Sequence, residues 1–275
     1  MHDQLIVVTG ASDGIGAAAA RQLRALGATV VVVGRSPEKT AAVAARLEAR
    51  FYVADYTLLA EVRRLAEQLG NDLPRIDLLA HNAGGIFGVR ELTVDGHERT
   101  LQVNHLAPFL LTQLLRERLI ESRARVITTS SVANKVFSRL DLDDLELTHR
   151  YSARVAYGNA KLANILFTRE LHRRHHGAGL AAAAFHPGGV ASNFAAESSS
   201  LLRLVYRTPL RHRLLISPAA GADTLVWLAR TTPGVEWRSG GYYVRRALSG
   251  AVDKLADDPE AARALWERSA ALLGR

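Results

Sequence analysis

The sequence predicts a doubly wound α/β fold: a parallel sheet covered by helices on both faces, in a single domain. Short apolar runs rich in β-branched residues recur between alanine- and leucine-rich stretches of helix length. Continuous apolar strands of this kind are typical of a parallel sheet that is buried on both faces. No proline- or serine-rich linker interrupts the 275 residues, of which 48% are hydrophobic. We therefore expect residues 1–275 to form one domain.

Six predicted strands alternate with helices, and a seventh lies near the C-terminus. The strands are expected at 5–9, 28–34, 50–54, 76–81, 124–130, 180–186 and 242–244. A closing helix should begin at Asp258 and Pro259, because an aspartate caps a helix well and proline is tolerated at the first helical position. Such alternation favours parallel strands joined by crossover helices.

A glycine-rich turn, TGASDGIG, joins the first predicted strand to the first helix. Glycines at this place let the backbone approach a pyrophosphate, and the helix N-terminus supplies unpaired N–H groups and a favourable dipole. The spacing departs from the G-x-G-x-x-G form, and a turn that serves packing alone is the alternative. The position between strand and helix nevertheless predicts that this turn binds a dinucleotide. The predicted contacts are Gly10, Ser12, Asp13, Gly14, Ile15 and Gly16.

The end of the second predicted strand indicates which dinucleotide is bound. An NAD site usually has an acidic residue there for the ribose 2′-hydroxyl, whereas this chain has Gly34 and Arg35. Glu38 falls in the first turn of the next helix, where it complements the helix dipole. A guanidinium suits a 2′-phosphate by charge and by bidentate geometry. We therefore predict NADP(H) rather than NAD(H), the alternative being a solvated arginine at a strand end.

The stretch YGNAK places Tyr157 and Lys161 four residues apart, on one face of a predicted helix. Free tyrosine has a pKa near 10 and is a poor acid or base at neutral pH unless a nearby positive charge favours the phenolate. The pair therefore suggests a tyrosine acid/base. Taken alone, however, such a spacing is far more often a chance pair on a solvated face.

Together with the glycine turn, further motifs in chain order resemble the short-chain dehydrogenase/reductase family. They are HNAG at 81–84, VNH at 103–105, TSS at 129–131, YGNAK at 157–161 and HPGGVAS at 186–192. The stretches QVNHLAPFLLTQLL and KLANILFTREL are similar to the branch that contains retinol dehydrogenases. The resemblance runs from Leu5 to the final helix and implies a Rossmann fold.

The resemblance implies a catalytic tetrad of Asn104, Ser131, Tyr157 and Lys161. Tyr157 would exchange a proton with the substrate oxygen, and Ser131 would hydrogen-bond that oxygen. Lys161 would bind the nicotinamide ribose and lower the tyrosine pKa, while Asn104 would hold a water that links Lys161 to solvent. Hydride transfer changes the charge on oxygen, so a positioned acid/base lowers its barrier. The choice of Ser131 over Ser130 follows from the resemblance only.

The same resemblance implies further cofactor contacts. They are Asp55, Tyr56, Asn82, Ala83, Gly84, Val190 and Ser192, in addition to Tyr157 and Lys161. Asp55 and the segment 82–84 could instead form simple strand-end turns. Ser192 stands where the family often has threonine, and it keeps the hydroxyl.

We expect an NADP(H)-dependent oxidoreductase that interconverts a carbonyl and an alcohol on a small, apolar substrate. The alternative is a catalytically silent nucleotide-binding sensor or scaffold, and the presence of both Tyr157 and Lys161 favours the enzyme. The acidic stretch LDLDDLEL at 140–147 could shape the site entrance. The segment at about 190–215 is expected to be a substrate loop or lid, with a membrane-surface helix or a packed helix as alternatives.

Composition disfavours several other classes. The net charge is +8, but the arginines are spread along the chain without a basic block, so we expect no nucleic-acid partner. The chain has no cysteine, which excludes disulfides and thiolate metal sites. His172 and His176 share a helix face near a helix end, where a basic side chain suits the dipole, and we expect no metal. Neither a signal peptide nor a membrane span is predicted, so we expect a cytoplasmic protein, with membrane-surface association and homo-oligomerisation left open.

Overall fold

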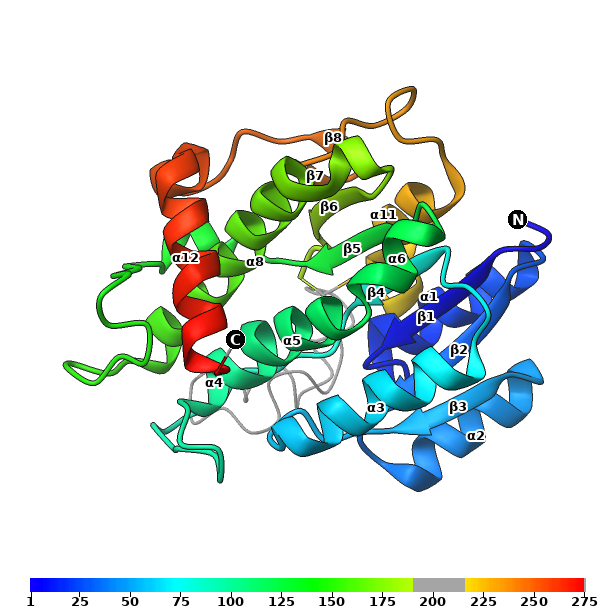
Figure 1. Ribbon diagram of the computed structural model, residues 1–275, viewed down its shortest axis with the longest axis horizontal. Helices are drawn as coiled ribbons and strands as arrows, with labels where there is room; N and C mark the ends of the chain where they lie inside the picture. The colour runs from blue at the N-terminus through cyan, green and yellow to red at the C-terminus, as the bar shows by residue number, and fades with distance from the viewer. Residues whose placement is uncertain (190–215, 275) are drawn as a thin grey trace.

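The computed structural model describes residues 1–189 and 216–274, and its strands form one eight-stranded sheet. The order across the sheet is β3-β2-β1-β4-β5-β6-β7-β8, and only the β7–β8 pair is antiparallel (Figure 1). The strands are β1 Leu5–Thr9, β2 Thr29–Gly34, β3 Arg50–Val53, β4 Leu78–His81, β5 Arg125–Thr129, β6 Ala181–His186, β7 Gly241–Val244 and β8 Ala247–Leu248. The predicted doubly wound fold is confirmed, and the seven expected strands are present with ends that differ by one or two residues.

Helices cover both faces of the sheet (Figure 1). The longer helices are α1 Gly14–Ala25, α2 Pro37–Leu47, α3 Leu59–Asp72, α5 Ala107–Leu114, α8 Ala153–His175, α11 Pro218–Arg230 and α12 Pro259–Leu272. The shorter ones are α4 Arg99–Leu101, α6 Arg116–Glu121 and α7 Ala133–Val136, with a π-helix at Gln102–Leu106. The predicted start of the closing helix is confirmed, because the Asp258 carboxylate accepts a hydrogen bond from the Glu260 N–H at 2.9 Å.

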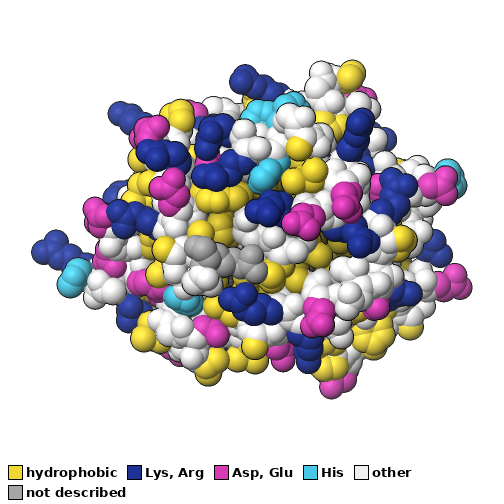
Figure 2. All heavy atoms as spheres, in the orientation of Figure 1, with side chains coloured by type: hydrophobic (Ala, Val, Ile, Leu, Met, Phe, Trp, Pro, Cys, Tyr) yellow, Lys and Arg dark blue, Asp and Glu magenta, His cyan; other side chains and the backbone are white. Residues whose placement is uncertain are grey.

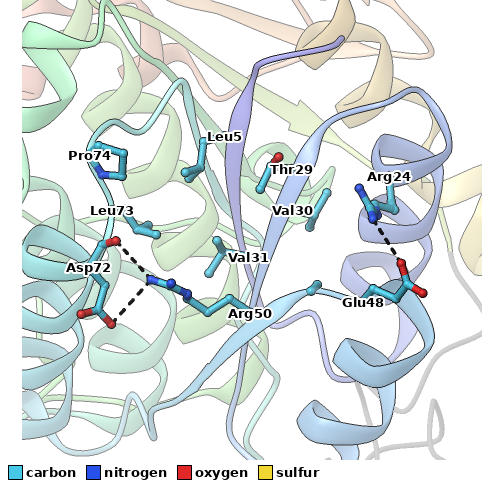
Figure 3. Close-up of a pocket in the computed structure, with 11 residues that line it drawn as sticks. Leu5, Arg24, Thr29, Val30, Val31, Glu48, Arg50, Asp72, Leu73 and Pro74 are labelled. Atoms are coloured by element: carbon cyan, nitrogen blue, oxygen red, sulfur yellow. Dashed lines mark hydrogen bonds and ion pairs between the residues drawn. The ribbon is translucent and has the colours of Figure 1, made fainter.

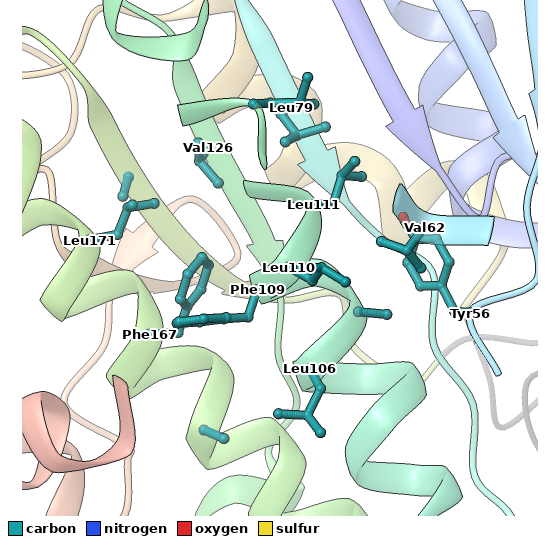
Figure 4. Packing of buried hydrophobic residues seen from close by; sticks show 14 of the residues in the cluster. Tyr56, Val62, Leu79, Leu106, Phe109, Leu110, Leu111, Val126, Phe167 and Leu171 are labelled. Atoms are coloured by element: carbon teal, nitrogen blue, oxygen red, sulfur yellow. The ribbon is translucent and has the colours of Figure 1, made fainter. Parts of the chain in front are cut away.

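Two apolar cores lie on opposite faces of the sheet, because successive side chains of a strand point to opposite sides. On β1, Val7 packs in the core beneath α3, α5, α8 and α12, whereas Ile6 and Val8 pack in the core beneath α1, α2 and α11. Figure 4 shows the first core, where Phe109 of α5 meets Phe167 of α8 with ring centroids 5.8 Å apart. The central strands β1, β2, β4, β5 and β6 are therefore largely buried on both faces, as their continuous apolar runs predict, whereas the edge strands β3 and β8 are more exposed.

The strand order determines where loops converge. The chain leaves β1 for β2 on one side and later returns to β4 on the other side of β1. In open α/β sheets a crevice forms at such a reversal, outside the carboxyl ends of the strands. The loops that follow β1, β2, β4 and β5 therefore meet at one edge, and these loops contain most of the residues that the motifs single out.

The short helix α7 lies very close to α8 because residue 158 is glycine. A Cβ at Gly158 would lie 2.7 Å from the Ser138 nitrogen and 2.8 Å from the Phe137 carbonyl carbon. These are backbone atoms, so they cannot swing aside as a side-chain end can. The glycine inside YGNAK thus sets the distance between the segment after β5 and the helix that carries Tyr157.

We expect Gly158→Ala to destabilise the protein although alanine favours helix. Overpacking against α7 should lower the free energy of unfolding by at least about 1 kcal/mol. Gly70 in α3 is the matched control, because a Cβ there meets nothing within 4 Å. Gly70→Ala should raise stability by about 0.5–1 kcal/mol, since glycine disfavours helix. Urea denaturation of both variants tests this, and equal effects of the two substitutions would contradict the packing argument.

Candidate active site

One cavity of about 780 Å³ runs along the carboxyl edge of the sheet, from the end of β2 to α8. It brings together most of the residues predicted from the motifs. Those lining it are Gly10, Ser12, Asp13, Gly14, Ile15, Arg35, Asp55, Tyr56, Asn82, Ala83, Gly84, Ser131, Tyr157 and Lys161. Gly16 and Asn104 lie behind the wall. The predicted contacts Val190 and Ser192, and the predicted substrate loop at 190–215, lie outside the described residues.

A second, smaller hollow of about 200 Å³ opens near the start of β1 and β2, and it lacks the features of an active site (Figure 3). Its charged side chains are paired with each other: Arg24 with Glu48 at 3.7 Å, and Arg50 with Asp72 at 3.9 Å. None of the residues singled out by the motifs lines it. The chemistry therefore belongs to the larger cavity.

Thr9 and Asn82 hold the glycine turn against the loop after β4. The Thr9 hydroxyl accepts hydrogen bonds from the N–H groups of Asn82 and Ala83 at 3.1 and 3.2 Å. The Asn82 amide in turn donates to the Thr9 and Gly10 carbonyls at 3.1 and 3.2 Å. The asparagine of the HNAG motif thus supports the turn as well as lining the cavity.

The glycines of this turn are required by close approach. A Cβ at Gly10 would lie 2.7 Å from the Ala83 Cα, and the backbone of Gly10 has a φ of 63°. A Cβ at Gly16 would lie 2.5 Å from the Asn82 amide nitrogen. Asp13 caps α1 by accepting from the Gly14 N–H at 2.7 Å. These glycines let the turn pack closely against the loop after β4, while Gly10, Gly14 and Ile15 place the start of α1 at the cavity wall.

The corner after β2 has two cationic side chains. Arg35 and Lys39 both line the cavity, and Lys39 is a contact that the sequence reading missed. The sequence contains a signal for Lys39: Ser36-Pro37 marks the start of α2, and Lys39 lies in the first turn of that helix. Glu38 lies in the same turn, as predicted, and its hydrogen bonds with the backbone and with Ser36 lower its pKa.

Asp55 forms a strand-end turn and also lines the cavity. Its carboxylate accepts from the Thr57 N–H and hydroxyl, each at 2.9 Å, which is the hydrogen bonding of a strand-end turn. Asp55 also lines the cavity next to Tyr56. Burial raises the pKa of the Tyr56 phenol, so that group stays neutral.

Lys161 is buried, with 2% of its surface exposed, yet it lines the cavity. Its ammonium donates to the Thr129 carbonyl at 3.3 Å and lies 5.4 Å from the centre of the Tyr157 ring. Burial lowers the pKa of Lys161 to about 7, because the charged form loses its hydration. The helical spacing thus brings the two side chains together in a site that disfavours an isolated charge.

The two adjacent serines after β5 have different surroundings. The Ser130 hydroxyl is buried and donates to the Lys161 carbonyl at 2.7 Å, which ties the strand end to α8. The Ser131 hydroxyl is partly exposed and accepts from the Ala133 N–H at 3.2 Å. Ser131 therefore lines the cavity with a partly exposed hydroxyl, whereas the Ser130 hydroxyl has a structural role that the sequence did not indicate.

Asn104 lies in the π-helix and buttresses the loop after β4. Its amide donates to the Gly85 and Thr100 carbonyls, both at 2.9 Å, and accepts from the Gly85 N–H at 3.2 Å. A Cβ at Gly84 would lie 2.5 Å from the Asn104 oxygen and 3.3 Å from the Lys161 ammonium. Gly84 is thus the residue that lets Asn104 and Lys161 approach each other.

The structure changes the expectation for the acidic stretch at 140–147. The acidic stretch at 140–147 does not line the cavity: Leu145 joins the core, and the Glu146 carboxylate bonds to His97 at 2.8 Å. The leucines of this stretch pack in or against the core, and none of its residues lines the cavity. Other described residues that line the cavity are Phe87, Val132, Phe137, Arg154 and His186, of which only His186 belongs to a family motif.

The histidine pair near the end of α8 has protein partners. His172 bonds to the Ser239 hydroxyl at 2.9 Å, and His176 bonds to the Leu180 carbonyl at 3.3 Å.

Figure 2 shows basic and acidic side chains interspersed over one face of the molecule, rather than a block of one sign. Within residues 1–189 and 216–274, no helix has the length and apolarity to cross a bilayer.

Comparison with known proteins agrees with these motifs. A family model described as short chain dehydrogenase matches residues 4–201. The chain is 44% identical over 276 residues to a Streptomyces protein named "Putative daunorubicin C-13 ketoreductase DnrU", covering 98% of this chain and 92% of that one. It is 36% identical over 279 residues to human retinol dehydrogenase 12, covering 98% and 86%. The predicted resemblance to the retinol dehydrogenase branch is confirmed.

The fold is likewise similar to that of solved structures. One is the Pseudomonas aeruginosa RhlG/NADP active-site complex, which is 27% identical. The similarity covers 88% of this chain and 94% of that one, with a TM-score of 0.69.

We expect Lys161→Met to stabilise the ligand-free protein most at low pH. The folded-state pKa of Lys161, about 7, lies below the unfolded value near 10.5. Between these values the unfolded chain binds the extra proton, so wild-type stability rises with pH; below pH 7 the full cost of burying the ammonium remains. The gain from methionine should therefore be larger at pH 6 than at pH 9, by about 2–3 kcal/mol. Denaturation curves at both pH values test this, and a pH-independent gain would contradict it.

Proposed function

The chain belongs to the short-chain dehydrogenase/reductase family of oxidoreductases, and on this premise we propose that it interconverts a carbonyl and an alcohol with NADP(H), using Tyr157 as acid/base. The observation that carries the proposal is the buried Lys161 ammonium, 5.4 Å from the Tyr157 ring inside the cavity. A solvated pair at the surface would change the pKa of the tyrosine little, because water screens the charge. A silent scaffold would have no need to bury a lysine, at a cost in stability, beside a phenol.

The described residues suit a phosphorylated dinucleotide. The glycine turn and the N-terminus of α1 would hold the pyrophosphate, because both line the cavity and the first turn of a helix has N–H groups without intrahelical partners. Arg35 and Lys39 would hold a 2′-phosphate by charge. An acidic residue for a 2′-hydroxyl does not follow β2 directly, since positions 34 and 35 are glycine and arginine.

The reaction we propose divides hydride and proton between cofactor and protein. When bound, NADPH supplies a hydride to the carbonyl carbon, and NADP⁺ accepts one in the reverse direction. The Tyr157 hydroxyl gives its proton to the carbonyl oxygen in reduction and takes it back in oxidation. Ser131 donates a hydrogen bond to the same oxygen, where negative charge develops. The Lys161 ammonium favours the phenolate that remains on Tyr157.

The substrate is proposed to be a small molecule with an apolar body. Phe87, Val132 and Phe137 line the cavity, and Val132 is 48% exposed. The names of two relatives, a ketoreductase and a retinol dehydrogenase, support carbonyl and alcohol chemistry. Assays of aldehydes, ketones and alcohols with each cofactor, followed by nicotinamide absorbance, test the proposal. Tight NADPH binding without turnover on any compound would favour the sensor instead.

Tyr157→Phe should lower turnover by about 10²–10⁴ while leaving NADPH affinity nearly unchanged. The substitution removes the acid but keeps the ring and its packing. Steady-state kinetics and a cofactor titration measure the two quantities separately. Near wild-type turnover in this variant would show that Tyr157 is not the acid/base.

Arg35→Ala should weaken NADPH binding about tenfold or more and change NADH binding little. The variant leaves the 2′-phosphate without a charge-assisted contact, typically about 1.5–3 kcal/mol, whereas NADH has no group at that position. Dissociation constants for both cofactors decide the matter. Equal losses for the two would refute a specific role in NADP(H) selection.

A further inference from the structure

We propose that the cavity contains an anion subsite at Arg154, which selects carbonyl substrates carrying a carboxylate or similar acidic group on an apolar body. The proposal rests on the oxidoreductase function above and narrows its substrate class. It concerns the substrate half of the cavity, which we define as the part lined by the segments after β5 and β6 and by α7 and α8.

Arg154 lies close to the proposed acid/base. It is in the first turn of α8, three residues before Tyr157, so the two side chains leave the same side of the helix. Both line the cavity, and Arg154 is exposed at its mouth. A substrate whose carbonyl reaches Tyr157 therefore places its remainder about one helical turn away, beside the guanidinium.

The charge of Arg154 is not neutralised within the described part of the chain. Its recorded contact there is the Phe137 ring, with the guanidinium carbon 5.9 Å from the ring centre. Other arginines of the same helix behave differently, since Arg173 and Arg174 both bond to the buried Glu170 carboxylate at 2.6 Å. Arg154 thus keeps its fork of N–H donors for another partner, and such a fork matches a carboxylate bidentately.

The surrounding wall favours an anion over a cation. Among the described lining residues the only carboxylates are Asp13 and Asp55, which follow β1 and β3, whereas α8 packs against β5 and β6. His186 faces the substrate half from β6, and burial lowers its pKa, so it adds no charge at neutral pH. In its described wall, the substrate half therefore has two basic side chains, Arg154 and the buried Lys161, and no acidic one.

Apolar groups next to Arg154 complete the subsite. Val132 and Phe137, which flank α7, line the same part of the cavity. Phe137 supports the guanidinium by a cation–π contact, and an aromatic ring of a substrate would meet an apolar surface there. Partial exclusion of water strengthens an ion pair relative to one in bulk solvent. An aromatic keto acid fits this combination of charge and surface.

The test uses two ketones that share one skeleton, 4-acetylbenzoate and its neutral methyl ester, each reduced with NADPH at pH 7.5 and low salt. The readout is the ratio of kcat/KM for the acid to that for the ester. Arg154→Gln should lower this ratio about tenfold or more, because a charge-assisted contact is lost for the acid alone. The matched control is Lys135→Gln, which removes one charge from the exposed side of α7 outside the cavity and should change the ratio less than twofold.

A ratio that changes less than threefold in Arg154→Gln, or changes equally in Lys135→Gln, would overturn the subsite. Binding of both ketones to the NADPH complex, measured by calorimetry, separates this result from failure of the proposed function. Tighter binding of the acid that is lost in Arg154→Gln would support the subsite even without turnover. Absence of that preference would refute it, whatever the enzyme's activity.

Discussion

The site depends on one unfavourable feature, the burial of the Lys161 amine at the carboxyl edge of the sheet. Burial lowers the pKa of this group to about 7, because the charged form loses its hydration and needs a hydrogen-bond acceptor or an anion nearby. The Thr129 carbonyl is its hydrogen-bond acceptor, and the Tyr157 ring lies 5.4 Å away. An anion at the phenol oxygen would favour the ammonium again, so lysine and tyrosine should titrate as a coupled pair.

The rest of the architecture brings the partners of this amine together. The reversal of strand order at β1 and β4 gathers the glycine turn and the HNAG loop at one edge. The Ser130 hydroxyl fixes α8 to the end of β5 through the Lys161 carbonyl. Gly84 and Gly158 remove side chains at the places where Asn104 and α7 must come close. The fold thus positions one helix turn with several independent contacts.

Periodicity and motifs were sufficient to predict the sheet and most of the motif residues that line the cavity, because buried parallel strands and glycine turns leave strong local patterns. The uses of Ser130 and Gly84 could not be predicted in this way, since both depend on distances between segments far apart in the chain. The stretch at 140–147 was expected to shape the site entrance because it is acidic, but its leucines pack in or against the core. Lys39 could have been predicted from the sequence, because it follows a recognisable helix start.

The central claim is that the charge of Lys161 sets the pH at which Tyr157 can accept a proton. The most direct test is the pH dependence of alcohol oxidation by the wild type and by Lys161→Met, measured at saturating NADP⁺. Loss of a neighbouring cation disfavours the phenolate, so the inflection of log kcat should move to higher pH by more than one unit in the variant. The same inflection in both proteins would contradict the account.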